Sequence, residues 1–499
     1  MRITRYSPAA RFRSATRSRP GGRSPHWRFT IRADLRWVAG ALGVAGFDEG
    51  PAGDTAIDGV SIDTRDGTGG RLFVALQGER ADGHDYLPAA AEGGAAALLV
   101  RRDRMGEAVR AVSAIPVLGV ADPLAGLQAI ARAWLDRVAP LVVAVTGSSG
   151  KTGTKELIAA AVSASRRAHA TAGNRNNHIG VPLSVLAMPE GTEVLVLEMG
   201  ASGRGEIAAL CRIAPPRIGV ITNIGPGHLE SFGTLKGVAA AKAELIGSLA
   251  GDGTAVLPAD DGFIGYLRGK TGSPVVTFGF DEGADVRIED VRPRDGGGYT
   301  CLIGGSPFEI RRFGRHNLLN AAAAAAVARV LDLPAQGVAA AIAGTRAAGG
   351  RGVVYDIAGL AVVDESYNSN PASLRAAVDA FMEIPSQGRR WLILGDMLEL
   401  GAESSALHAE AGIFCGKAGV DGLVTLGRET VELSRTAAEQ RKAPADISHF
   451  MEPQSLAAYL DARLAAGDAV LVKGSRGMRM ETVIDEIERR RGVARRRID

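Results

Sequence analysis

The segment AVTGSSGKTGTKE, residues 144–156, decides the fold of this chain. An apolar run at 141–145 leads into a turn of glycine and serine at 147–150, and the residues from 152 onward suit a helix. A buried strand that enters a helix through such a turn directs backbone N–H groups and the positive helix end at a phosphate. We expect Lys151 to neutralise phosphate charge and the Thr152 hydroxyl to ligate Mg²⁺. The segment therefore predicts an ATP site.

Position 145 departs from the usual phosphate-loop pattern, because it holds Val where GxxxxGK[ST] has Gly. A chance strand–turn–helix segment is the alternative, but a lysine is unusual at a turn that a plain glycine cap could form. The expected nucleotide-binding residues of this loop are Gly147, Ser148, Ser149, Gly150, Lys151 and Thr152.

Further apolar runs of strand length lie on both sides of the loop. Two follow it at 194–198 and 218–222, two precede it at 71–76 and 95–100, and four more lie at 360–363, 391–394, 422–426 and 469–472. Helix-compatible stretches separate them. This alternation predicts an α/β fold with parallel sheets, whose ligands gather at the carboxyl ends of the strands.

Length and charge restrict the function further. A chain of 499 residues predicts several domains, and its 65 glycines predict many tight loops. Residues 1–33 carry nine Arg and no acid, and residues 489–499 carry six Arg. The remainder has 43 basic against 54 acidic residues, which argues against a nucleic-acid-binding protein.

The cysteines and the hydropathy pattern exclude other classes. Cys211, Cys301 and Cys415 lie too far apart for a disulfide scaffold or a structural zinc site, which indicates a reducing compartment. No uncharged apolar run reaches the length of a membrane span. Residues 1–29 predict a disordered basic extension or a start codon placed too far upstream, with an organellar transit peptide as the alternative.

Eight more motifs follow in order along the chain. They are TAGNRNNHIGVPLSVL (171–186), EMGASGRGEI (198–207), NIGPGHLESFG (223–233), AKAEL (241–245), GRHNLLNAAAA (314–324), DESYNSNPASL (364–374), LGDMLELG (394–401) and VKGSRGMRME (472–481). Together with the phosphate loop they resemble the Mur ligases over about residues 30–487.

The resemblance implies a fold and an activity. It implies a three-domain α/β architecture, with a UDP-substrate-binding domain at 30–121, a central ATP-binding domain with a parallel sheet at 122–346 and a Rossmann-like domain at 347–488, followed by a basic tail at 489–499. The implied reaction is ATP-dependent addition of D-alanyl-D-alanine to UDP-N-acetylmuramoyl-tripeptide through an acyl phosphate. The resemblance also implies a cytoplasmic, monomeric enzyme of peptidoglycan precursor synthesis, with ATP and Mg²⁺ as cofactors.

Three residues beyond the loop are implied metal ligands. Glu198 ends the apolar run 194–198 and His228 follows the run 218–222, so both side chains are expected at strand ends near the phosphate loop. Lys242 is implied to be carbamylated and to hold a second Mg²⁺. The alternatives are a helix or surface charge for Glu198, an ordinary loop histidine for His228 and a solvated or Glu244-paired side chain for Lys242.

The resemblance also implies nucleotide contacts. Asn317 and Asn320 share one helical face and are expected at the adenine and ribose, with a helix cap as the alternative for Asn317. Arg351 is expected to reach the γ-phosphate, with Arg346 as its rival. Asp364 and Glu365 replace the usual Asp-Asp pair, which leaves open which carboxylate meets the ribose or a lysine.

The implied substrate contacts fall in three groups. Asp63, Thr64 and Arg65 belong to the UDP-binding module, and Asn174, Asn176 and Asn177 are expected at the muramoyl tripeptide unless they only form a turn. Asn368, Asn370 and Asp396, with Glu399, are expected to shape the D-Ala-D-Ala site. Lys473, Ser475 and Arg476 are expected to bind the dipeptide carboxylate or to cap the following helix.

Other functions remain alternatives. The nearest is a ligase that adds meso-diaminopimelate or lysine, but its D-N-P-R and D-Y-A-H signatures are absent. A folylpolyglutamate synthetase would lack the UDP-substrate-binding domain at 30–121. A non-catalytic P-loop partner protein is the alternative from another class, and Lys151, Glu198, His228 and Lys242 together argue against it.

The segment AAGGRG, residues 347–352, is suited to a hinge, because glycine tolerates large changes of φ and ψ. We expect the third domain to close onto ATP about this segment.

Overall fold

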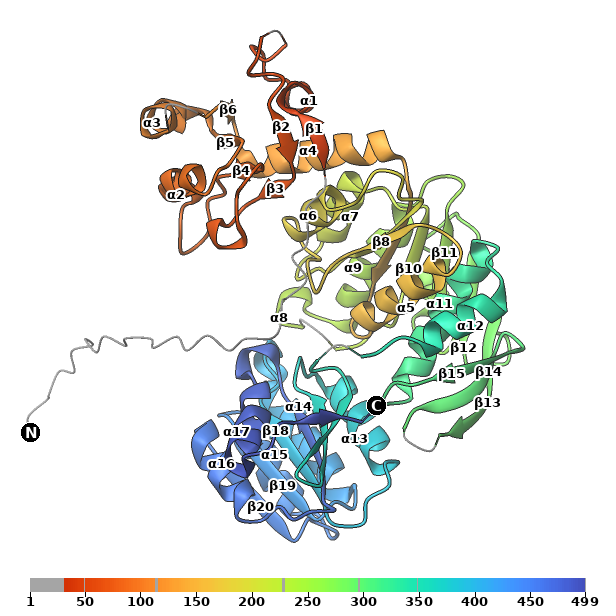
Figure 1. The fold of residues 1–499 in the computed structure, drawn as a ribbon. Coiled ribbons are helices and arrows are strands. Elements are labelled where there is room, and N and C mark those ends of the chain that lie inside the picture. The colour runs from red at the N-terminus through yellow and green to blue at the C-terminus, as the bar shows by residue number, and fades with distance from the viewer. Residues whose placement is uncertain are drawn as a thin grey trace, which may run out of the picture.

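The computed structural model describes residues 31–48, 50–112, 115–226, 229–294, 297–347 and 349–498. Figure 1 shows three bodies in chain order, with the first part of the chain in red and orange, the middle in yellow and green and the last part in blue. Over the described residues the strands form four sheets. The predicted extension at 1–29 lies outside the described residues.

The first part of the chain contains a small parallel sheet and an antiparallel pair. β1 (Arg32–Asp34) pairs with β2 (Ala56–Asp58), and the parallel sheet has the order β3 (Val60–Ser61), β4 (Leu72–Val74), β5 (Ala97–Arg101) and β6 (Val117–Val120). Its helices are α1 (Leu35–Leu42), α2 (Leu87–Glu92) and α3 (Met105–Ala111). α4 (Pro123–Val138) starts at the side-chain cap of Asp122 and packs on both α1 and the next part of the chain.

The central sheet carries the phosphate loop. Its order is β15-β14-β13-β12-β11-β10-β7-β9-β8, parallel from β8 to β13 and antiparallel from β13 to β15. The strands are β7 (Leu141–Thr146), β8 (Ala168–Ala170), β9 (Val194–Glu198), β10 (Ile218–Ile221), β11 (Thr254–Pro258), β12 (Val275–Gly279), β13 (Val286–Pro293), β14 (Tyr299–Ile303) and β15 (Ser306–Ile310). β7 lies between β9 and β10, so the carboxyl ends of these three strands meet beside the loop.

The central helices cover this sheet. They are α5 (Lys151–Ser163), α6 (Gly180–Leu186), α7 (Glu206–Ile213), α8 (Leu229–Phe232), α9 (Leu235–Gly247), α10 (Ile264–Arg268), α11 (His316–Val330) and α12 (Ala335–Ala343). The alanines of α11 are buried against α5 and the sheet. Small side chains let the two helices approach closely, which brings residues of α11 to the phosphate loop.

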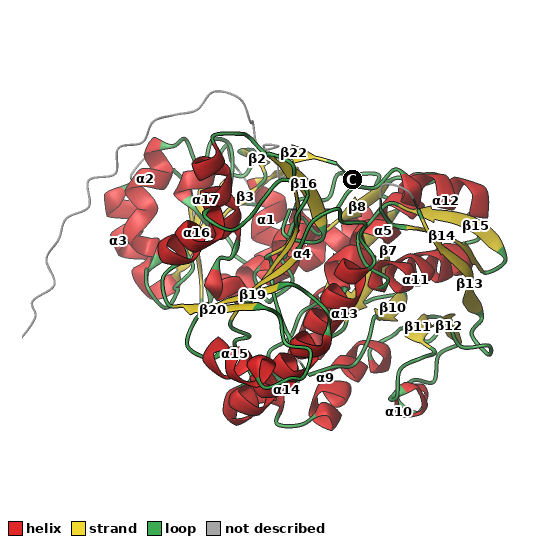
Figure 2. Ribbon diagram, turned by 90° about the horizontal axis from the view of Figure 1, so that it is seen from below, coloured by secondary structure: helices red, strands yellow, loops and turns green. Residues whose placement is uncertain are grey.

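The C-terminal sheet has the order β20-β19-β18-β21-β17-β16-β22. Its strands are β16 (Val353–Ile357), β17 (Leu360–Glu365), β18 (Arg390–Gly395), β19 (Gly422–Leu426), β20 (Asp446–Phe450), β21 (Ala469–Lys473) and β22 (Arg496–Arg497). Figure 2 shows α16 (Pro453–Asp461) and α17 (Glu481–Arg491) on one face, and α14 (Ser404–Lys417) and α15 (Thr430–Ala438) on the other. α13 (Pro371–Met382) follows β17.

The predicted α/β class with parallel sheets is confirmed, and the apolar runs quoted above coincide with β4, β5, β7, β9, β10, β17, β18, β19 and β21. The predicted basic tail at 489–499 is not separate from the C-terminal sheet and its helices over the residues that the structure describes, 489–498. Arg489–Arg491 end α17, and β22 adds an antiparallel edge strand beside β16. Across the described residues, no helix combines the length and apolar character that a bilayer span requires.

Candidate functional site

The phosphate loop has the backbone that its glycines require. Gly147 has φ 151° and Gly150 has φ 76°, the latter in the left-handed region that glycine favours. A Cβ at Gly147 would lie 1.9 Å from the Thr222 hydroxyl, and a Cβ at Gly150 would lie 2.7 Å from Asn320 Oδ1. Both positions therefore exclude larger residues for a steric reason as well as a conformational one.

The end of β10 holds the loop in shape. The Thr222 hydroxyl donates to the Ser149 carbonyl at 2.6 Å, and Asn223 Oδ1 accepts from the Ser149 N–H at 3.0 Å. Ser148 Oγ accepts from Gly225 N–H at 2.9 Å. Our sequence analysis missed Thr222 and Asn223 as site residues. Their position after the strand next to β7 was the available signal.

Lys151 begins α5 and curls back over the loop. Its Nζ donates to the Gly147 carbonyl at 2.8 Å, and burial lowers the pKa of the ammonium from its ordinary value. This ammonium is half-buried and lines the cavity described below, where it is available to phosphate oxygens.

Glu198 connects two other predicted site residues. Its Oε2 accepts from the Thr152 hydroxyl at 2.7 Å and its Oε1 accepts from Asn176 Nδ2 at 2.8 Å. This buried carboxylate beside a hydroxyl is a set of hard oxygen donors, which is what Mg²⁺ prefers. Thr152 and Glu198 therefore fit a magnesium ion that also contacts phosphate. Among the described residues no three His, Cys, Asp or Glu side chains cluster as a metal site, and His228 lies outside that range.

Lys155, which we did not predict, supports the asparagine loop. It lies one turn after Lys151 on α5, is buried, and its Nζ donates to the carbonyls of Thr171 at 2.7 Å and Gly173 at 3.3 Å. These bonds position the segment that carries Asn174, Asn176 and Asn177, which line the cavity described below. A second lysine at spacing i, i+4 was its sequence signal.

Asn317 and Asn320 meet the phosphate loop from α11. Asn320 Oδ1 accepts from the Thr154 hydroxyl at 3.0 Å, and its Nδ2 donates to Asn317 Oδ1 at 3.1 Å. Asn317 Nδ2 donates to the Phe313 carbonyl at 2.7 Å, so this side chain does not cap the helix N-terminus. Burial lowers the pKa of the neighbouring His316, which lines the same cavity.

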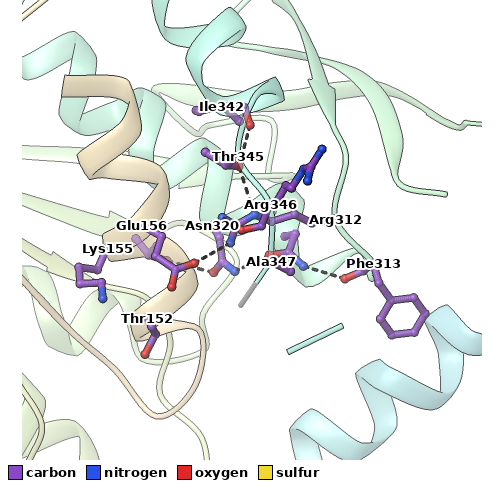
Figure 3. Close-up of polar contacts among 12 residues, drawn as sticks. Thr152, Lys155, Glu156, Arg312, Phe313, Asn320, Ile342, Thr345, Arg346 and Ala347 are labelled. Carbon is purple, nitrogen blue, oxygen red and sulfur yellow. Dashed lines mark hydrogen bonds and ion pairs between the residues drawn. The ribbon is translucent and has the colours of Figure 1, made fainter. Parts of the chain in front are cut away.

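Arg312 is a further cation of the site that sequence reasoning missed (Figure 3). It is buried, pairs with Glu156 of α5 at 3.2 Å, and donates to the Thr345 hydroxyl and the Arg346 carbonyl, both at 3.3 Å. Burial is the main cause that lowers its pKa. Arg346 itself does not line the cavity, whereas Arg312 and Arg351 do.

The C-terminal sheet contributes a buried ion pair. Glu365 Oε2 lies 3.1 Å from Lys473 Nζ, and these side chains are 13% and 2% exposed. Lys473 also donates to the Asn368 carbonyl at 2.9 Å, so it does not cap the next helix. Asp364 instead accepts from Gly350 N–H at 2.9 Å and from the Ser366 hydroxyl at 2.5 Å. Of the two carboxylates, Glu365 meets the lysine and lines the cavity.

Two arginines lie over Tyr367. The guanidinium of Arg351 is 3.9 Å from the ring centroid and that of Arg476 is 5.7 Å from it. Cation–π attraction of this kind holds a guanidinium in place without neutralising it. Tyr367 was another unpredicted residue of the site.

These groups line one cavity of about 710 Å³ between the central and C-terminal sheets. The predicted residues in its wall are Ser148, Ser149, Gly150, Lys151, Thr152, Asn174, Asn176, Asn177, Glu198, Asn317, Asn320, Arg351, Glu365, Asn368, Asn370, Lys473 and Arg476. Lysine and arginine side chains approach it from both sheets. The arrangement can bind a polyanion and bring a second reactant against it from the opposite side.

Asp396 and Ser475 do not lie in the cavity wall. Asp396 is buried and its carboxylate accepts from the N–H groups of Arg428, Glu429 and Thr430, which start α15. Ser475 Oγ bonds the Ser369 carbonyl and the Leu398 N–H. In this structure both side chains are occupied by backbone groups, and their part in the D-Ala-D-Ala site stays a prediction.

Asp63, Thr64 and Arg65 lie together in the first part of the chain, away from that wall. Asp63 caps a short 3₁₀ turn by accepting from Arg65 N–H at 2.9 Å. The Arg65 guanidinium, 2.6 Å from this carboxylate, lowers the pKa of Asp63 from its ordinary value. The motif therefore presents a basic, 88% exposed side chain on a fixed turn.

Lys242 is buried on α9. Its Nζ lies 3.5 Å from the Ala201 carbonyl and 5.4 Å from the Phe232 ring, and it does not reach the cavity wall. Burial, assisted by the charge of Lys151, lowers its pKa to about 7. A large part of this lysine is therefore a neutral amine near neutral pH.

Comparison with protein families gives three matches along the chain. The Mur ligase family catalytic domain matches residues 56–133, the Mur ligase middle domain matches 145–328, and the Mur ligase glutamate ligase domain matches 350–476. The UDP-N-acetylmuramoyl-tripeptide–D-alanyl-D-alanine ligase of Bacillus subtilis is 35% identical over 92% of this chain and 98% of its own length. The Escherichia coli ligase of the same name is 36% identical over 87% and 94%.

Solved structures agree with this. MurF from Acinetobacter baumannii superposes with a TM-score of 0.81 at 27% identity, covering 92% of this chain and 99% of that one. MurF from Thermotoga maritima, solved in complex with ADP, superposes with a TM-score of 0.75 at 31% identity, covering 87% and 97%. The phosphate loop, the order of the sheets and these full-length similarities lead to one conclusion: the chain belongs to the Mur ligase family.

Proposed function

We propose that this protein is the ATP-dependent ligase that joins D-alanyl-D-alanine to UDP-N-acetylmuramoyl-tripeptide. The observation that carries the proposal is one shared cavity, to which the central part of the chain contributes Lys151 and Glu198 and the C-terminal part contributes Arg351 and Lys473. Full-length similarity to ligases of that name supports it. We propose 30–121 and 122–346 as the first two domains and a third that begins at 347 and includes α17 and β22, with a cytoplasmic monomer as the working form.

The chemistry requires an activated carboxylate. In the first step an oxygen of the tripeptide carboxylate forms a bond to the γ-phosphorus, the bond from that phosphorus to the β,γ-bridging oxygen breaks, and ADP leaves. In the second step the amine of D-alanyl-D-alanine attacks the acyl carbon, phosphate leaves, and the amine loses a proton. Both reactants of the first step are anions, so the wall cations are needed to bring them together.

We assign the residues as follows. Lys151, Arg312 and Arg351 hold phosphate oxygens, and Asn317 with Asn320 orients the nucleoside. Asn174, Asn176 and Asn177 position the tripeptide carboxylate opposite Lys151. Asn368, Asn370, Lys473 and Arg476 face this point from the C-terminal sheet and hold the dipeptide.

Thr152 and Glu198 are the proposed magnesium ligands, with His228 and Lys242 as further ones. The ion supplies charge neutralisation at the phosphates. A neutral Lys242 amine can add to carbon dioxide and lose a proton, which forms an N–C bond. The product is an anionic carbamate in place of the side chain's amine. The lowered pKa of Lys242, about 7, favours this reaction, because only the neutral amine is a nucleophile.

The test measures phosphate release from ATP with UDP-N-acetylmuramoyl-tripeptide. We expect turnover when D-alanyl-D-alanine is the second substrate. We expect none when the protein receives the UDP-N-acetylmuramoyl-dipeptide together with meso-diaminopimelate or lysine. Turnover only with diaminopimelate or lysine would assign the chain to the preceding ligation. No turnover with any acceptor, although ATP binds, would favour a non-catalytic partner protein.

A further inference from the structure

The linker between the central and C-terminal sheets is fixed at both ends. On the central side Arg312 donates to the Thr345 hydroxyl and to the Arg346 carbonyl, as Figure 3 shows. On the other side Gly350 N–H donates to Asp364 Oδ2 at 2.9 Å, and Tyr367 N–H donates to the Gly350 carbonyl at 3.0 Å. We expect any change of angle between the two sheets to be taken up between these fixed ends, Arg346 and Gly350.

The C-terminal strand reaches this bending point. β22 pairs with β16, with Arg497 opposite Tyr355, and Ile498 N–H donates to the Val354 carbonyl at 3.0 Å. Arg495 binds Asp485 and Glu488 of α17, which holds the strand on its sheet. From this fixed strand Arg497 Nη1 donates to the carbonyl of Ala347 at 3.0 Å.

Two further observations place the contact between Arg497 and Ala347 on the side of the linker that faces the protein interior and Arg312. Ala347 is buried, whereas the neighbouring Arg346 is exposed. Burial and then Arg497 and Arg351 act to lower the pKa of Arg312, against the opposite effect of Glu156. The Arg497 guanidinium thus lies within electrostatic reach of a cation of the cavity wall.

We propose that Arg497 is a positioning residue, which holds the linker at Ala347 and so sets the angle at which the C-terminal sheet presents Arg351 and Lys473 to the phosphate loop. It does not touch the cavity and acts through Ala347. Loss of the contact widens the range of angles between the sheets and lowers the fraction of molecules that can hold ATP from both sides. Apparent affinity falls by that fraction, whereas molecules that do close react at the usual rate.

The neighbouring arginine provides a matched control. Arg496 lies in the same strand, is exposed, and has Asp356 as its backbone register partner in the sheet. Arg497→Ala and Arg496→Ala remove the same side chain from adjacent positions. They differ in the contact with Ala347.

The experiment compares steady-state kinetics and amide hydrogen exchange in the full-length variants. We expect Arg497→Ala to raise KM for ATP about tenfold, the range of one charged hydrogen bond, with kcat within about twofold. Exchange at residues 345–352 should accelerate in the same variant. Arg496→Ala should leave both measurements unchanged, and Arg497→Lys, which keeps a charged donor, should recover most of the ATP affinity.

The inference is overturned if Arg497→Ala has a wild-type KM and wild-type exchange at 345–352, or if Arg496→Ala produces the same change. A fall in kcat with an unchanged KM would also overturn it, because that result indicates a role in chemistry. If Arg497→Ala does not fold, Arg497→Met replaces it, since its apolar side chain still fills much of the site but has no N–H to donate to Ala347. A wild-type KM in that variant has the same meaning.

Discussion

Two glycines that begin helices allow the steric role of Asn320 to be measured. Gly150 precedes α5 with φ 76° and ψ −6°, and Gly205 precedes α7 with φ 82° and ψ −14°. A Cβ at Gly150 would lie 2.7 Å from Asn320 Oδ1, whereas a Cβ at Gly205 would meet nothing within 4 Å. Gly150→Ala and Gly205→Ala therefore carry the same backbone strain but differ in one contact.

The structure gives the size of the effect. Left-handed backbone costs a non-glycine residue about 1–2 kcal/mol, which is the whole expected loss for Gly205→Ala. Gly150→Ala must also displace Asn320, which bonds Thr154 at 3.0 Å and Asn317 at 3.1 Å. Two bonds worth about 1 kcal/mol each raise the expected loss to about 3–4 kcal/mol.

Amide hydrogen exchange measures both losses locally, at α5 for one variant and at α7 for the other. ADP affinity, measured by calorimetry, should fall for Gly150→Ala and stay unchanged for Gly205→Ala. Adding Asn320→Ala to Gly150→Ala should make the combined loss smaller than the sum of the single losses by about 1 kcal/mol or more. Equal losses for the two glycine variants, or additive losses in the double variant, would refute the argument.

Three more results are expected. Lys151→Ala should abolish phosphate release without changing the circular dichroism spectrum, and a wild-type rate would remove the phosphate loop from the mechanism. The second result concerns the free energy of unfolding of the wild type relative to Lys242→Met, measured in buffer free of carbon dioxide. This difference should rise with pH by up to about 1.4 kcal/mol per pH unit between pH 7 and 10.5. In that window Lys242 is protonated in the unfolded chain but neutral in the folded one, so raising the pH favours the folded state. Denaturant titrations that give a constant difference would contradict the lowered pKa. Glu365→Gln should lower the stability of the C-terminal domain by about 3 kcal/mol, more than Lys473→Met, because it leaves the buried ammonium unpaired; equal melting shifts would disprove this.

The strands near the site were predictable because they are fully buried. Apolar runs such as 194–198 and 469–472 match β9 and β21, and their carboxyl ends identify the edge where Glu198 and Lys473 lie. The antiparallel extension β13–β15 was not predicted, although alternating burial in β13 and β15 is the pattern of a half-buried strand, because the predicted strands rest on continuous apolar runs alone. β22 was missed for another reason: it consists of two arginines, and only pairing with β16 makes it a strand.

The residues of the site divide in a similar way. Lys151, Thr152 and Glu198 follow from local pattern, because the loop and the strand end determine where they point. Arg312, Tyr367 and Asn223 depend on contacts with segments distant in the chain, and a single arginine or tyrosine carries no local signal of such a contact. Asp396 shows how a motif can be misleading about a single side chain: the motif was assigned to the site, but in this structure the carboxylate accepts from the N–H groups at and just before the start of α15.

The return of the Lys151 ammonium to the Gly147 carbonyl has a consequence for the entropy of ligand binding. An ammonium has three N–H donors, and this one gives one to the Gly147 carbonyl at 2.8 Å and a longer one to the Ser148 carbonyl at 3.4 Å. The loop therefore holds its own lysine in position before an anion arrives, and one donor remains for that anion. Less side-chain freedom is then lost when a phosphate binds than would be lost on a freely rotating lysine.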